Sequence, residues 1–276
     1  MNFLIAIFQG IVQGITEWLP ISSTGHMLLL NQLLPMKGVS AGFFDLFKVV
    51  IQFGSILAVI VLFFHKLNPW ARTKSPLQKR ETWSLWGKVL IASIPAAIVG
   101  LLFNDAIDNA LSTPAVIASM LILFGILFIV VESLHLKTRT DSFAQVTFRM
   151  ALLMGVFQMV ALIPGVSRSG VTIIGALLIG CARPMAAEFS FFMAIPVMLG
   201  ASALKMLVFV KNDGVPKLGD ILLLLVGMVV AFAVSLLVIG ALMRFVKKHN
   251  FKPFGVYRIA LGVLVLVLLA AGFFPG

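Results

Sequence analysis

The sequence predicts an all-α polytopic membrane protein of two inverted-topology repeats, each a re-entrant helical hairpin followed by three transmembrane helices. Composition and long apolar runs indicate this fold class. Apolar residues make up 61% of the 276 residues and charged residues only 11%, whereas soluble domains carry about 25% charged residues. The apolar residues form runs long enough for helices to cross a bilayer. This excludes a soluble enzyme, a disordered protein and a secreted disulfide scaffold.

Two interrupted apolar regions predict the hairpins. Residues 2–34 and 147–182 each contain an apolar helix, a break with proline and glycine, and a second apolar arm. The arm at 25–34 would rise roughly 15 Å as a helix, about half of a bilayer. Irregular backbone at membrane depth is tolerated only where protein or a water-filled cavity surrounds it. We therefore expect each region to turn back within the membrane.

Six further segments have the roughly 20 apolar residues that a span needs. They lie at residues 43–64, 86–103, 115–134, 187–210, 221–243 and 253–274.

The distribution of basic residues orients these spans. Lys and Arg gather in the connections at 65–88, 135–149 and 244–252. Connections of this kind lie in the cytoplasm, whereas the 104–114 connection carries Asp105 and Asp108 without a basic residue. The two hairpins then enter from opposite sides of the membrane.

This orientation predicts one membrane domain over residues 1–276. The first repeat covers 1–134 and the second, inverted repeat covers 146–276. A few identities agree, although chance similarity among apolar helices is the alternative. They pair Ala6, Gly10, Gln13, Ser22 and Gly25 with Ala151, Gly155, Gln158, Ser167 and Gly170. Inverted repeats with broken helices place a site near the membrane midplane, where the halves meet.

The net charge of +11 has a plain explanation in the cytoplasmic connections, so we expect no nucleic-acid partner. Cys181, the one cysteine, lies in an apolar run and is expected to pack in the core.

The first hairpin carries a polar face. Gln9, Gln13 and Glu17 are four residues apart and therefore lie on one side of a helix. A carboxylate in hydrocarbon costs at least roughly 2.5 kcal/mol, so this face must meet a cavity or a cation. For the glutamines, hydrogen bonding between packed helices is an equal alternative.

The break that follows is rich in hydroxyl groups. Ser22, Ser23 and Thr24 begin the second arm, where helix capping is the commonest role of such residues. Ser23 and His26 are three residues apart and share a helical face. A hydroxyl near an imidazole is the outline of a nucleophile and its base.

The second break predicts an anion site. Ser167, Arg168, Ser169, Gly170 and Thr172 begin a helix, whose N-terminus attracts anions. The Arg168 guanidinium suits phosphate oxygens. If the hairpins meet, Glu17 and Gln13 face Arg168 across a cavity. A carboxylate would repel a phosphate there, so we expect a bridging divalent cation, Mg²⁺ or Ca²⁺, at Glu17 and Gln13.

Two motifs carry a family resemblance. QGITEWLPISSTGH (13–26) and PGVSRSGVT (164–172) resemble the signature motifs of the BacA/UppP family, the bacterial undecaprenyl-diphosphate phosphatases associated with bacitracin resistance. The resemblance implies hydrolysis of a polyisoprenyl diphosphate lipid in the bacterial inner (cytoplasmic) membrane, at a site open to the periplasm. One departure is Lys48, where many relatives are expected to carry Glu.

The resemblance also implies residue roles. Glu17 would be the metal carboxylate, Ser23 the nucleophile and His26 the acid or base. Arg168, Ser167 and Thr172 would hold phosphate. The remaining expected substrate-binding residues are Ser22, Thr24, Ser169 and Gly170.

The sequence therefore predicts metal-assisted phosphoryl transfer, with either Ser23 or water activated by His26 as the attacking group. The alternatives are a lipid-phosphate flippase or transporter, both activities in one protein, or a structural membrane subunit, which would leave Glu17 and Arg168 unexplained. Formation of a homodimer is left open.

Overall fold

The computed structural model describes residues 1–274, without the side chains of residues 41, 104 and 105. Asp105, which helped to orient the 104–114 connection, therefore lies outside the described side chains. The helices of the described chain are α1 (Asn2–Thr16), α2 (Ser23–Leu33), α3 (Ala41–Leu62), α4 (Phe64–Leu67), α5 (Pro76–Leu111), α6 (Pro114–Ser133), α7 (Phe148–Met159), the 3-10 turn η1 (Val160–Leu162), α8 (Arg168–Ile179), α9 (Arg183–Asp213), α10 (Leu218–Val246) and α11 (Lys252–Ala270).

Six of these helices are long and apolar enough to cross a membrane: α3, α5, α6, α9, α10 and α11. Each corresponds to one of the six predicted spans, although α3, α6 and α11 end at Leu62, Ser133 and Ala270, short of the predicted ends at residues 64, 134 and 274. No strand occurs in residues 1–274. The all-α polytopic class is therefore confirmed.

Several helices extend beyond their predicted spans. α5 begins at Pro76 rather than at residue 86, because Ser75 caps it and the Gln78 side chain completes a reciprocal capping box. At its other end α5 continues to Leu111, so most of the predicted 104–114 connection is helical. Hydropathy identifies the apolar part of a helix, whereas the capping residues that set its ends are polar and lie outside the apolar run.

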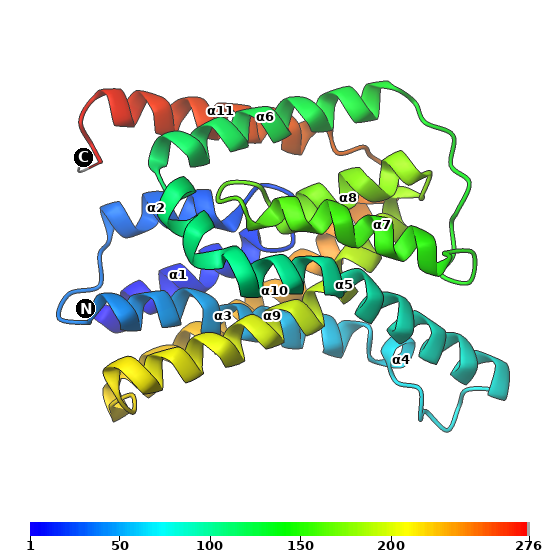
Figure 1. The fold of residues 1–276 in the computed structure, drawn as a ribbon, viewed down its shortest axis with the longest axis horizontal. Coiled ribbons are helices and arrows are strands. Elements are labelled where there is room, and N and C mark those ends of the chain that lie inside the picture. The colour runs from blue at the N-terminus through cyan, green and yellow to red at the C-terminus, as the bar shows by residue number, and fades with distance from the viewer. Residues whose placement is uncertain (275–276) are drawn as a thin grey trace.

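Pairs of long helices pack side by side. α6 runs along α11, α1 along α10, α5 along α7, and α3 lies between α9 and α10 (Figure 1). Gly125 of α6 and Gly255 of α11 face each other so closely that a Cβ on either would lie 2.7 Å from the carbonyl oxygen of the other. Small residues of this kind let membrane helices approach closely.

Two helical hairpins meet in the middle of the molecule. α1 and α2 come from the end where the chain termini lie, and α7 and α8 come from the opposite end (Figure 1). The tips are irregular: Ser22 has a φ of 71° and Gly165 a φ of 93°. Ser22 caps α2 through the backbone N–H of Gly25, and Ser167 caps α8 through that of Gly170. The polar residues of both breaks are thus brought together at the centre of an apolar bundle.

Candidate functional site

Glu17 and Arg168 form an ion pair between the two hairpin tips. Glu17 follows the last residue of α1, and Arg168 begins α8. Arg168 Nη2 lies 3.2 Å from Glu17 Oε1, and the two side chains are only 12% and 6% exposed. The predicted meeting of the acid and the guanidinium is therefore present, as a direct contact rather than across a gap.

The second oxygen of Glu17 accepts two further hydrogen bonds. Gln13 Nε2 donates to Glu17 Oε2 over 2.9 Å, one turn back along α1. Ser23 Oγ donates to the same oxygen over 3.1 Å, from the first residue of α2. Three donors from three helices thus fix one buried carboxylate. Gln9 continues the same buried face, but neither polar atom of its amide has a partner among the described residues.

Arg168 is held by more than its ion pair. Its Nη1 donates to the carbonyl oxygen of Ser190 in α9 over 2.8 Å. Its guanidinium carbon lies 5.8 Å from the ring centroid of Trp18, a cation–π distance. The Nε has no partner in the described part of the chain. A donor is therefore left over on a group that already faces Glu17.

The other predicted phosphate ligands mostly bind protein. Ser169 Oγ donates to the carbonyl oxygen of Glu17 over 3.2 Å, which joins the two tips. Ser167 Oγ accepts from the N–H of Gly170 over 3.1 Å. Thr172 Oγ1 bonds to the Arg168 carbonyl and to the hydroxyl of Ser190. In this arrangement Ser167, Ser169 and Thr172 stabilise the turn that presents Arg168.

His26 has partners other than the expected serine. Its Nδ1 bonds to the carbonyl oxygen of Ser22 over 2.8 Å, and its Nε2 bonds to the Tyr257 hydroxyl over 2.7 Å. The rings of His26 and Tyr257 are nearly parallel, 5.6 Å apart. Within the described residues no hydrogen bond joins Ser23 to His26, because Ser23 turns to Glu17 instead. Thr24 is exposed.

Two residues of α11 were not predicted for the site. Arg258 is fully buried and donates from Nη2 to the carbonyl oxygen of Gly165 over 3.0 Å and from Nη1 to that of Pro20 over 3.3 Å. It therefore bridges the two hairpin tips. Its neighbour Tyr257 holds His26. A guanidinium within an apolar span and the one tyrosine of the chain were the available signals.

The donor set at Glu17 fits a hard divalent cation with few protein ligands. No group of three or more His, Cys, Asp or Glu side chains occurs among the described residues. Glu17 would supply the carboxylate, and Gln13 and Ser23 would add amide and hydroxyl oxygens. Mg²⁺ is often bound by one or two carboxylates together with substrate phosphates and water. Such an ion therefore suits this site when a phosphate-bearing substrate completes it.

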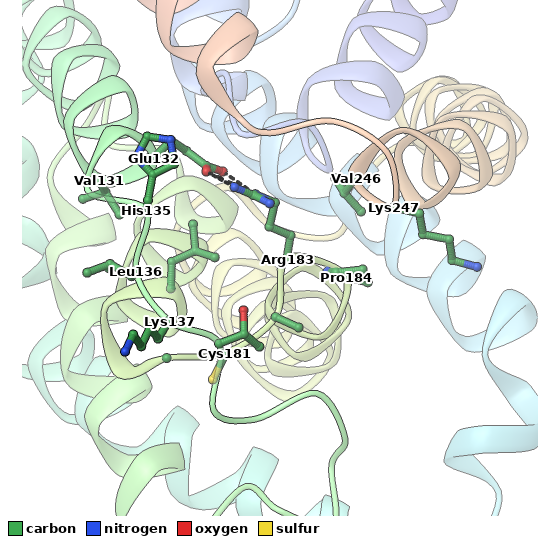
Figure 2. Close-up of a pocket in the computed structure, with 14 residues that line it drawn as sticks. Val131, Glu132, His135, Leu136, Lys137, Cys181, Arg183, Pro184, Val246 and Lys247 are labelled. Atoms are coloured by element: carbon green, nitrogen blue, oxygen red, sulfur yellow. Dashed lines mark hydrogen bonds and ion pairs between the residues drawn. The ribbon is translucent and has the colours of Figure 1, made fainter.

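A separate cavity of about 220 Å³ lies between the ends of α6, α8 and α10. Figure 2 shows its wall, where Arg183 reaches Glu132, with a closest contact of 2.6 Å. Burial raises the pKa of the Cys181 thiol in this wall to about 11, so it stays protonated and weakly nucleophilic. Cys181 is a buried free cysteine, as expected. The cavity contains none of the predicted site residues.

Comparison with known proteins agrees with the motifs. The family model "Bacitracin resistance protein BacA" matches residues 6–264. The chain is 53% identical over 274 residues to an undecaprenyl-diphosphatase of Enterococcus faecalis, covering 98% of both chains. It is 52% identical over 269 residues to one of Latilactobacillus sakei, covering 96% of this chain and 97% of the relative. It is 54% identical over 262 residues to undecaprenyl-diphosphatase 1 of Clostridioides difficile, covering 95% and 94%. The chain therefore belongs to the bacitracin resistance protein BacA family.

Proposed function

We propose that this membrane protein hydrolyses undecaprenyl diphosphate to undecaprenyl phosphate and inorganic phosphate, and so recycles the lipid carrier of cell-wall synthesis. The observation that carries the proposal is the buried Glu17–Arg168 pair at the meeting point of two polar breaks. A guanidinium can bind the terminal phosphate, and a carboxylate can hold a divalent cation beside it. The names of the relatives point to the same substrate.

Arg168 would bind the terminal phosphate. Among the described residues its Nε has no partner and its Nη2 bonds to Glu17 alone, so phosphate oxygens can compete for these donors. A guanidinium fixed by Ser190 before the substrate arrives needs little reorganisation when charge develops in the transition state. Glu17, with Gln13 and Ser23, would hold the divalent cation, which when bound supplies Lewis-acid neutralisation of the phosphate charge.

Ser23 is the favoured attacking group. Its hydroxyl already donates to Glu17 Oε2, so that carboxylate is placed to accept the proton. Attack on the terminal phosphorus would form a phosphoserine and break the bond to the bridging oxygen. Undecaprenyl phosphate would leave, and water would then release inorganic phosphate from Ser23. His26, held by Ser22 and Tyr257, would move protons to the leaving oxygen or from the water. Direct attack by water that His26 activates is the alternative route.

We also propose that the two hairpins are re-entrant and that residues 1–134 and 146–276 form inverted repeats. Matching helix pairs support this: α1 packs on α10 as α7 packs on α5, while α3 meets α9 and α6 meets α11.

The proposed location is the bacterial inner membrane, with the site open to the periplasm. Side chains of the 65–88 connection share one cavity wall with residues 142–144, and side chains of the 135–149 connection share another with Lys247. The basic connections thus gather at one end, as a cytoplasmic face requires.

Phosphate release by the purified protein in detergent tests this function. Undecaprenyl diphosphate with Mg²⁺ or Ca²⁺ should yield phosphate, and a chelator should stop the reaction. Arg168→Lys should lose nearly all turnover and remain folded. A transporter needs two compartments, so a protein that moves the lipid across vesicles but releases no phosphate in detergent would contradict the proposal.

A further inference from the structure

A second charged cavity lies at the end of the molecule where the basic connections meet. It has a volume of about 620 Å³ and is lined by α4, the first turns of α5 and residues 142–144 of the α6–α7 connection. None of the residues placed at the Glu17–Arg168 site lines it. Its size falls in the range of ordinary small-molecule sites.

The wall of this cavity carries an excess of positive charge. Lys66, Lys74, Arg80 and Lys88 line it, and Glu81 is the acidic residue among the lining side chains. Lys66 is already paired with Glu188 over 2.6 Å. Among the side chains that the structure describes, no carboxylate oxygen lies within ion-pair distance of the other three cations.

Two of these cations are buried. Lys74 is 9% exposed and Lys88 is 5% exposed. Lys74 Nζ donates to Thr82 Oγ1 over 2.7 Å and to the Lys66 carbonyl over 3.2 Å. Lys88 Nζ donates to the Phe143 carbonyl over 2.8 Å. An ammonium has three donors, so both retain capacity for an acceptor in the cavity.

Burying an ammonium without a counter-ion is unfavourable. Burial lowers the pKa of the Lys74 ammonium below its ordinary value. An anion in the cavity would act as a counter-ion to the two buried ammonium groups and so offset the cost of burying them. Hydroxyls of Ser84 and Ser142 in the same wall can donate to its oxygens.

We propose that this cavity is a second anion site, separate from the hydrolytic centre, that binds a phosphate group through Lys74 and Lys88. The phosphate is carried by an anionic phospholipid head group or is free inorganic phosphate. Basic pockets between membrane helices on the cytoplasmic side bind such head groups. Lysine contributes a compact point charge that suits phosphate.

Binding to the full-length protein in detergent tests the proposal. Native mass spectrometry measures binding of phosphatidylglycerol, with phosphatidylcholine as the neutral comparison, and calorimetry measures binding of inorganic phosphate. The variants are Lys74→Gln and Lys88→Gln. The matched control is Lys79→Gln, which removes the same charge from the same region but does not line the cavity.

A head-group site predicts that phosphatidylglycerol binds at least tenfold more weakly to both cavity variants than to Lys79→Gln, with no such difference for phosphatidylcholine. A free-phosphate site predicts that difference for inorganic phosphate alone. Phosphate bound at Arg168 is common to all variants, so the difference from Lys79→Gln reports on the cavity. Equal binding of both probes by the cavity variants and Lys79→Gln would overturn the proposal.

Thermal unfolding checks that each variant is folded. If Lys74→Gln or Lys88→Gln does not fold, Arg80→Gln tests the exposed wall of the same cavity. It should also bind the anionic probe more weakly than Lys79→Gln does, and equal binding would again contradict the anion site.

Discussion

Ser23 Oγ and Glu17 Oε2 are joined across the first hairpin break by a hydrogen bond of 3.1 Å, on the carboxylate whose other oxygen binds Arg168. Ser23→Ala should therefore lower turnover by about 10³-fold if the serine attacks, because attack by water alone remains. Rapid acid quenching of a reaction with terminally labelled substrate should trap labelled Ser23 in the unmodified protein. An Ala variant with turnover near the original would exclude the serine and favour water activated by His26.

Glu17→Gln should abolish turnover, and added divalent cations should not restore it. The substitution should also destabilise the protein by about 3–5 kcal/mol, because it leaves the Arg168 guanidinium buried without its carboxylate. Thermal unfolding in detergent measures this. Glu188→Gln is the matched control, since Glu188 pairs with a half-exposed Lys66 and such pairs contribute about 1 kcal/mol or less. Equal losses in the two variants would contradict a special role for Glu17.

Tyr257→Phe should lower kcat by up to about tenfold and leave KM nearly unchanged. The hydroxyl positions His26 through a single hydrogen bond, whose loss is worth about 1 kcal/mol. The pH profile of kcat should move as well, because the His26 ring loses a polar partner. A profile identical to that of the original protein would show that Tyr257 only packs against the ring.

Gly165→Ala should destabilise the fold by about 2 kcal/mol or more. Gly165 has a φ of 93°, and a Cβ there would lie 2.6 Å from the carbonyl oxygen of Ile117. Gly200→Ala is the control, because apart from the adjoining backbone of α9 no described atom lies within 4 Å of its Cβ position. Gly200→Ala should leave the unfolding temperature unchanged or raise it, since alanine favours helix. Equal unfolding temperatures for Gly165→Ala and Gly200→Ala would contradict a conformational requirement for glycine at position 165.

The sequence was sufficient for the spans and for the encounter of Glu17 with Arg168. A membrane requires long apolar runs in the spans and favours basic residues in the cytoplasmic connections. Both features are present in the sequence itself, so they can be recognised without coordinates. Helix ends such as Pro76 depended on a capping box outside the apolar window. The hydrogen-bond partners of Ser23 and His26 could not be predicted from the sequence, because they are set by how the helices lie in space. His26 meets Tyr257 from the last helix, and spacing within α2 carries no information about that helix.

From the sequence, Arg258 in its span was expected either to form a buried pair or to line the cavity, and spacing alone does not choose between these roles. The fold shows that its acceptors are the backbone carbonyls of Pro20, Met120 and Gly165. The Pro20 and Gly165 carbonyls lie in irregular turns, where no helical N–H is available to them.

The Arg258 bridge has a mechanical consequence. A carrier that alternates its access rocks one half of the molecule against the other, and such rocking would pull the Pro20 turn away from the Gly165 turn. Both turns are hydrogen-bonded to the same planar, buried guanidinium, which resists their separation. This bridge favours a fixed catalytic centre that the lipid head group enters, over a transporter that carries the head group from one leaflet to the other.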